Sequence, residues 1–147
     1  EVRVHRQSIV HSMVQYEDNA VLAQCGAPDM RTCIQYALTY PERKAGLAKE
    51  LDFASLATLT FARPDEDTFT LLPLCRKAIT RGGNLPAAVN GANEAAVDAF
   101  LRKKIGFTDI FRVVERAYEK AFFIENPTVE DIFETDRAAR RAVAEEY

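Results

Sequence analysis

The stretch PAAVNGANEAAVDAFLRK, residues 86–103, decides the fold class of the C-terminal half of this chain. Its apolar residues recur at the three- and four-residue spacing that places them on one face of a helix. The pattern ends at Gly106. The stretch therefore predicts a helix whose buried face is formed by Val89, Ala92, Ala96, Val97, Phe100 and Leu101.

Helical patterns continue on both sides of this stretch. Upstream, an apolar stripe begins near Phe69 and stops at Gly82 and Gly83, which suit the turn that follows a helix. Its inward residues are predicted to be Leu72, Leu74, Cys75, Ala78 and Ile79. Downstream, Thr108 is positioned to cap a third helix.

A fourth helix is predicted after Thr128, with Asp131 three residues on as the second half of a capping box. A further turn is expected to begin at Asp136. Four amphipathic helices joined by short connections predict an antiparallel helical bundle over residues 65–147.

The first 26 residues alternate apolar and polar side chains in the manner of strands. Turn-forming residues at 17–19 separate this run from a second one at 21–24, which predicts a β-hairpin. A short third strand is expected at 59–61. Because a lone hairpin is marginally stable in water, we expect these strands to belong to a larger sheet, completed in this chain or by another segment. The fold class is therefore α+β.

Between the strands, a helix is expected after Pro28, with Asp29 as its N-cap. It should end before Pro41, because the residue preceding a proline is pushed out of the α region. Residues 42–50 are highly charged and are predicted to form a linker. Asp52 is expected to cap one further helical turn.

Composition excludes several classes of protein. The chain has 147 residues and a net charge of −3, which argues against a nucleic-acid-binding protein. The sequence contains no run of about 18 apolar residues, so no membrane span is predicted. The three cysteines form no C-x-x-C pair and indicate a reducing compartment, the cytoplasm. Glu1 opens directly into a strand-like pattern, so we expect an N-terminal part to be missing.

The residues by themselves form no complete catalytic constellation. His5 and His11 are the only histidines, and on one extended strand they would lie about 20 Å apart, too far to share a metal ion. The polar pair Asn93 and Glu94 interrupts an apolar helix and is interpreted as a structural contact at a helix seam. The cysteines are most simply small hydrophobic residues: Cys25, Cys33 and Cys75.

Several motifs, taken in order, are more specific than any one of them alone. HRQSIVHSMV occupies residues 5–14, PDMR 28–31 and NGANE 90–94, followed by matching segments at 105–110 and 127–132. This order closely resembles the C-terminal portion of the 1-deoxy-D-xylulose 5-phosphate reductoisomerases, over essentially the whole chain. Two departures are Arg6 and Cys33, which stand where that family commonly has proline.

The resemblance implies an enzyme of non-mevalonate isoprenoid biosynthesis. Such enzymes isomerise 1-deoxy-D-xylulose 5-phosphate and reduce the product with NADPH to 2-C-methyl-D-erythritol 4-phosphate, using Mg²⁺ or Mn²⁺. They are homodimers built from an NADPH-binding domain, a central catalytic and dimerisation domain and a helical bundle. The resemblance assigns residues 1–64 to the end of the central domain and residues 65–147 to the bundle.

The resemblance also assigns roles to a few residues. Pro28 and Met30 are expected near the nicotinamide ring, although Met30 taken alone would be interpreted as core. His5 is expected at the edge of the substrate site. The nucleotide fingerprint, the metal-binding carboxylates and the phosphate ligands belong to the preceding half, so no catalytic or metal-binding residue is expected here and the chain alone should be inactive. The alternative is a stand-alone dimerisation or scaffold module.

Overall fold

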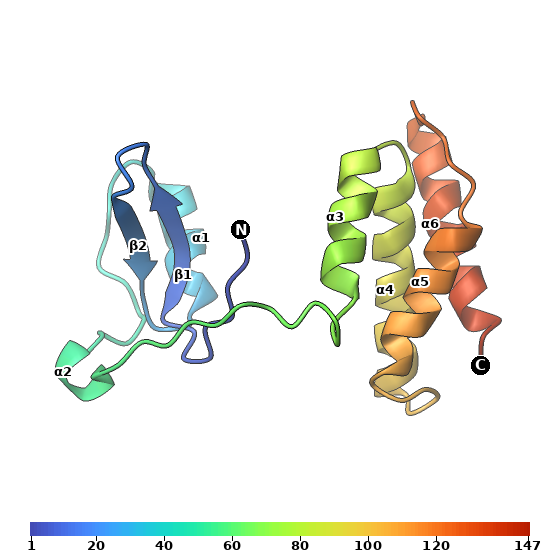
Figure 1. Cartoon of the computed structure of the whole chain (residues 1–147). Coiled ribbons are helices and arrows are strands. Elements are labelled where there is room, and N and C mark those ends of the chain that lie inside the picture. The colour runs from blue at the N-terminus through green and yellow to red at the C-terminus, as the bar shows by residue number, and fades with distance from the viewer. The chain divides into compact units, whose positions relative to one another are not determined.

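A computed structural model describes the whole chain, residues 1–147, and has the predicted α+β class. The chain divides into two compact units, Glu1–Pro64 and Asp65–Tyr147 (Figure 1). Strands occur only in the first unit, and the second unit consists of the four helices that follow residue 65.

The first unit is built on the predicted hairpin. Strand β1 (Val10–Gln15) pairs antiparallel with β2 (Val21–Cys25), and the register shifts by one residue between Val10 and Ser12. Asn19 adopts φ 67° in the connecting turn, a conformation that asparagine tolerates. The two strands pair with each other and with no other strand.

The predicted third strand at residues 59–61 is wrong, as is a continuous strand from residue 2. Val4 and Ala62 instead form an isolated antiparallel bridge, each N–H donating to the other's carbonyl at 2.9 Å. The chain then reverses, with Ser8 at φ 53° donating its N–H to the carbonyl of His5. This turn confines the strand proper to residues after Ile9.

Two helices complete the first unit. Helix α1 (Met30–Thr39) starts at the predicted N-cap and ends before Pro41 as expected, and α2 (Phe53–Leu56) is the single turn capped by Asp52. Residues 42–50 contain no helix or strand, but they lie inside the first unit rather than between the two units. The side-chain amide of Gln35 donates to the carbonyls of Lys44 and Ala45 and ties this segment to α1.

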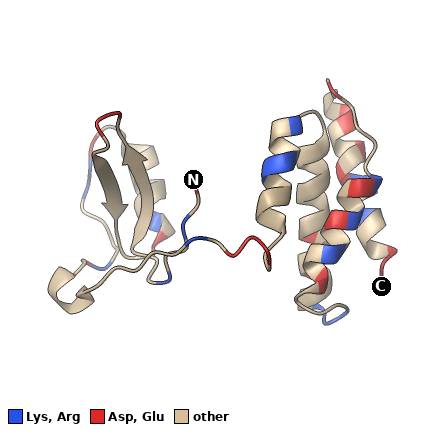
Figure 2. Cartoon of the chain, viewed as in Figure 1, with Lys and Arg blue, Asp and Glu red and all other residues tan.

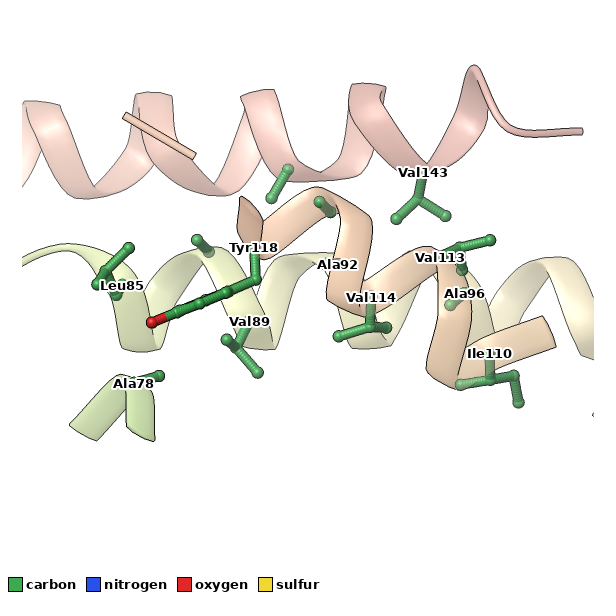
Figure 3. Close-up of a cluster of buried hydrophobic side chains, with 13 residues drawn as sticks. Ala78, Leu85, Val89, Ala92, Ala96, Ile110, Val113, Val114, Tyr118 and Val143 are labelled. Carbon is green, nitrogen blue, oxygen red and sulfur yellow. The ribbon is translucent and has the colours of Figure 1, made fainter. Parts of the chain in front are cut away.

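The second unit is the predicted helical bundle. It comprises α3 (Leu71–Arg81), α4 (Leu85–Leu101), α5 (Asp109–Lys120) and α6 (Val129–Ala144). Successive helices run in opposite directions, and α4 packs against each of the other three (Figure 1). Side chains from all four helices meet in one core, which Figure 3 shows around Val89, Val114 and Tyr118.

The buried face of α4 is narrower and made of smaller residues than the sequence predicted. Val97 and Leu101 are exposed, and so is Ile79 on α3. On α4, Gly91 explains this difference, because a Cβ there would lie 2.6 Å from Oδ1 of Asp136 on α6. The two helices approach through glycine and alanine, so the larger apolar side chains at the edges of the stripe fall outside the contact. The buried residues of α4 are Leu85, Ala88, Val89, Gly91, Ala92, Ala96 and Ala99.

The helix ends follow the predictions in part. Thr128 and Asp131 form the expected capping box, and Gly82 and Gly83 adopt positive φ at the end of α3. Thr108 makes no capping hydrogen bond. The carboxylate of Asp109, the first residue of α5, instead holds the preceding loop by accepting from the N–H of Gly106 at 2.9 Å. The separate turn expected from Asp136 is also wrong, since α6 runs without a break to Ala144.

Charged residues occur along the helices of the bundle (Figure 2). Glu94 pairs with Arg140 of α6 at 2.6 Å, in agreement with its interpretation as a seam contact. Glu146 accepts from Arg116 at 2.6 Å and from Lys120 at 3.2 Å, and these two cations hold its pKa below the usual range. The C-terminal residues are thereby fastened to α5.

Strands β1 and β2 contain no charged residue (Figure 2). Their side chains are nevertheless exposed in this chain, apart from Val10 and Cys25, which are half-buried. Helix α1 likewise has no buried residue, and its Leu38 is 82% exposed. Within residues 1–64 the only buried side chain is that of Ile9. The first unit therefore has no core of its own comparable to that of the bundle. No helix of the chain is both long and apolar enough to cross a bilayer.

Candidate functional site

A hollow of about 640 Å³ lies beside the start of the hairpin in the first unit. Both histidines line it, together with Phe61, which is distant in sequence. His5 and His11 do not lie on one extended strand, because the chain turns between His5 and Ser8 and β1 begins only at Val10. The remaining lining residues are Glu1, Val2, Arg3, Val10, Ser12, Met13, Gln15 and Val21.

The ring of His5 is held from two directions. Its Nδ1 lies 2.8 Å from the carbonyl oxygen of Thr60, and its ring stacks on Phe61 with centroids 4.6 Å apart and planes 17° from parallel. The side-chain oxygen of Gln7 accepts from the N–H and the hydroxyl of the same Thr60, at 3.4 and 3.0 Å. The remaining ring nitrogen of His5, Nε2, is buried and has no hydrogen-bond partner in the chain.

His11 has a different role in the same region. Its Nε2 lies 3.2 Å from the carbonyl of Gly26, just beyond β2. The N–H of Gly26 donates to the carbonyl of Ile9 at 2.9 Å. Together these contacts close the open end of the hairpin and fix the point at which the chain enters the segment before α1.

The segment Pro28-Asp29-Met30-Arg31 is rigid around its acidic residue. The Asp29 carboxylate accepts from the backbone N–H of Arg31 at 2.9 Å and from the guanidinium of Arg31 at 2.6 to 3.0 Å. These bonds, of which those from the Arg31 side chain are the strongest, lower the pKa of Asp29. A negative charge at the N-cap of α1 suits the helix dipole.

These bonds between Asp29 and Arg31 form a clamp, the Asp29–Arg31 clamp, which leaves Met30 turned away from the rest of the unit. Its side chain is 70% exposed and Pro28 is exposed as well, so Met30 is not a core residue of this chain. Neither residue lines the hollow that contains His5. A flexible, polarizable thioether on a rigid support is suited to packing against a flat aromatic ring.

The chain contains no group of three or more His, Cys, Asp or Glu side chains arranged to hold a metal ion. A hard divalent cation such as Mg²⁺ needs clustered oxygen ligands, and the histidine-lined hollow offers a single carboxylate side chain, that of Glu1. The residues present therefore do not fit a Mg²⁺ site. All three cysteines are unpaired.

Residues 25–142 match the family model described as the DXP reductoisomerase C-terminal domain. The chain belongs to this family. The match includes the Pro28–Arg31 segment and all four helices of the bundle up to residue 142.

Individual relatives are named as reductoisomerases. The chain is 52% identical over 141 residues to 1-deoxy-D-xylulose 5-phosphate reductoisomerase of Phocaeicola vulgatus, covering 96% of this chain and 37% of the relative. It is 52% identical over 139 residues to the enzyme of Agathobacter rectalis, covering 95% and 37%. The chain thus spans little more than a third of the length of the curated relatives it matches.

Solved structures agree with these matches. The reductoisomerase of Zymomonas mobilis in complex with NADPH superposes with a TM-score of 0.90 at 45% identity, over 99% of this chain and 39% of that one. A DOX-P reductoisomerase in complex with NADPH, fosmidomycin and magnesium gives a TM-score of 0.87 at 39% identity, over 98% and 38%.

Sequence reasoning missed the surroundings of His5 and one buried residue of the bundle. Gln7 is recognisable from the sequence only as part of a motif, and Thr60, whose carbonyl His5 contacts, lies 55 residues away in the sequence. Asn84, 1% exposed, bridges the start of α4 to the segment after α5. A polar residue directly after the helix-ending glycine pair was the only signal available for it.

Proposed function

We propose that this chain is the C-terminal part of an NADPH-dependent 1-deoxy-D-xylulose 5-phosphate reductoisomerase and has no turnover by itself. The observation that carries the proposal is the contrast between the two units. The bundle has a closed core, whereas residues 1–64 bury a single side chain and expose uncharged strands. A domain with so little core needs further polypeptide to cover it.

The first unit is proposed to be the end of the central catalytic and dimerisation domain. Apolar side chains stand exposed on its strands, including Met13, Val14 and Leu22. Such strands favour pairing with another segment, which supports contact with the preceding part of the enzyme and association into a homodimer. The free cysteines favour a reducing compartment, so we place the enzyme in the cytoplasm.

Two places in the first unit are proposed to face ligands. NADPH, when bound, supplies the hydride for the reduction. Pro28 and Met30 are proposed to cover one side of the nicotinamide ring, held in place by the Asp29–Arg31 clamp. His5 is proposed to stand at the edge of the sugar-phosphate site, and its Nε2, which is buried without a partner in this chain, is proposed to accept from a ligand hydroxyl there. The metal ligands are proposed to lie in the preceding part of the enzyme, since none is grouped here.

The experiment compares two purified proteins: residues 1–147 alone, and the longer polypeptide in which these residues follow their natural upstream sequence. Loss of NADPH absorbance is followed with 1-deoxy-D-xylulose 5-phosphate and Mg²⁺. We expect turnover from the longer polypeptide and none above the blank from the chain alone. Turnover by the chain alone would refute its dependence on the preceding part of the enzyme. An inactive longer polypeptide that has folded would refute the assigned reaction and favour a scaffold module.

A further inference from the structure

We infer that Thr60, Phe61 and Gln7 are positioning residues that hold His5 as the tautomer protonated at Nδ1, with Nε2 turned into an obligatory hydrogen-bond acceptor. The inference deepens the proposed function and rests on it for its meaning in catalysis. The tautomer itself follows from contacts within the chain.

The carbonyl oxygen of Thr60 decides the proton's position. A backbone carbonyl can only accept, so the ring nitrogen 2.8 Å from it, His5 Nδ1, must carry the hydrogen. In a neutral imidazole the other nitrogen then has a lone pair and no hydrogen. Nε2 of His5 is that nitrogen, and it is buried without a partner.

The plane of the ring is fixed independently of this bond. Phe61 stacks on the imidazole with centroids 4.6 Å apart and planes 17° from parallel, while the bond to the Thr60 carbonyl decides which ring nitrogen faces that carbonyl. The Thr60 peptide is itself fixed, since Gln7 accepts from both its N–H and its hydroxyl. The bridge between Val4 and Ala62 holds the two segments on either side of this cluster together.

An acceptor locked in this way selects its ligand. It binds a group that donates a hydrogen, such as a hydroxyl of a sugar phosphate, and disfavours a carbonyl or phosphate oxygen at the same position. Other charged or titratable groups that line the hollow are Glu1, Arg3 and His11. His11 provides an internal contrast, because its Nε2 lies 3.2 Å from the carbonyl of Gly26 and must therefore carry the proton. The only two histidines of the chain are thus assigned opposite tautomers.

The first test is nuclear magnetic resonance of the longer polypeptide with ¹⁵N-labelled imidazoles, at about pH 8.5, where an ordinary imidazole is neutral. Long-range ¹H–¹⁵N spectra should show one ring protonated at Nδ1 whose signals His5→Gln deletes, and one protonated at Nε2 whose signals His11→Gln deletes. A His5 ring protonated at Nε2, or one that averages between the two forms, would overturn the inference.

The second test uses a matched pair of variants in the longer polypeptide. Thr60→Val removes the hydroxyl but keeps the side-chain shape, whereas Thr60→Ser keeps the hydroxyl. Thr60→Val should raise KM for the sugar phosphate about fivefold, the factor that corresponds to losing one hydrogen bond. Thr60→Ser should leave KM close to that of the unsubstituted enzyme. In a His5→Ala background, Thr60→Val should have no further effect, because its action passes through His5.

Independent, multiplying effects of the Thr60 and His5 substitutions would show a merely structural role and overturn the inference. Absence of reductoisomerase activity in the longer polypeptide would instead refute the proposed reaction. The tautomer spectrum distinguishes the two failures, since it requires no substrate.

Discussion

Replacing Asn84 with alanine should destabilise the bundle more than any other single polar substitution within it. Asn84 is the N-cap residue of α4, but its side chain makes no capping hydrogen bond to that helix. Its amide nitrogen donates to the carbonyl of Phe122 at 2.8 Å and to the hydroxyl of Thr135 at 2.9 Å, and its oxygen accepts from the N–H of Ile124 at 2.9 Å. One buried side chain thus joins α4, the segment after α5 and α6.

The magnitude follows from these three bonds. Each contributes about 1 kcal/mol net, and two of the partners are backbone groups that lose a hydrogen bond on truncation. The free energy of unfolding should therefore fall by about 3 kcal/mol. For a domain of this size that corresponds to a decrease in Tm of about 12 to 24 °C.

The assay is thermal and urea unfolding of the chain followed by helical circular dichroism, which reports mainly on the bundle. Asn90→Ala is the control, because Asn90 is exposed on the same helix and bonds only to Glu94, at 3.1 Å. The control should change stability by no more than about 0.5 kcal/mol. If Asn84→Ala cost no more than Asn90→Ala, the assignment of Asn84 as the bridge between helices would be refuted.

Four further outcomes are expected. Gly91→Ala should destabilise the chain by about 1–3 kcal/mol in urea, because the added Cβ meets Asp136 at 2.6 Å; an unchanged midpoint would show that α4 and α6 are not closely packed. Stability should fall on acidification below about pH 4.5, because Glu146 and other carboxylates with lowered pKa become protonated there. Glu146→Gln should make Tm depend less on pH in this acidic range. An unaltered dependence of Tm on pH would argue against the ion pairs of Glu146. Met30→Ala in the longer polypeptide should raise KM for NADPH with Tm unchanged; a large loss of Tm with normal KM would make Met30 a core residue there. The isolated chain should dimerise or aggregate at micromolar concentration, and a clean monomer by light scattering would contradict exposed strands that seek a partner.

The features predicted correctly from sequence are those that neighbouring residues determine. The capping box of Thr128 and Asp131 and the N-cap Asp29 depend on residues within three positions of one another, and the structure confirms both. The hairpin followed from alternation and a polar turn. Fold class and the division into strands and bundle helices could be reached in this way.

The errors arise where distant residues decide. Periodicity identified the helices but overestimated their buried faces, since the close approach at Gly91 leaves Val97 and Leu101 outside the core. The position of His5 depends on Thr60 and Phe61, which no local pattern connects to it. Roles for Pro28 and Met30 came from resemblance alone and remain proposals.

Hydrogen exchange tests most directly the central claim that the bundle carries its own core while residues 1–64 need the rest of the enzyme. Amide protection would be compared between the dilute isolated chain and the longer polypeptide. We predict equal protection of α3 to α6 in both proteins, and protection of β1, β2 and α1 only in the longer one. Strands of the isolated chain protected as strongly as those of the longer polypeptide would contradict the account.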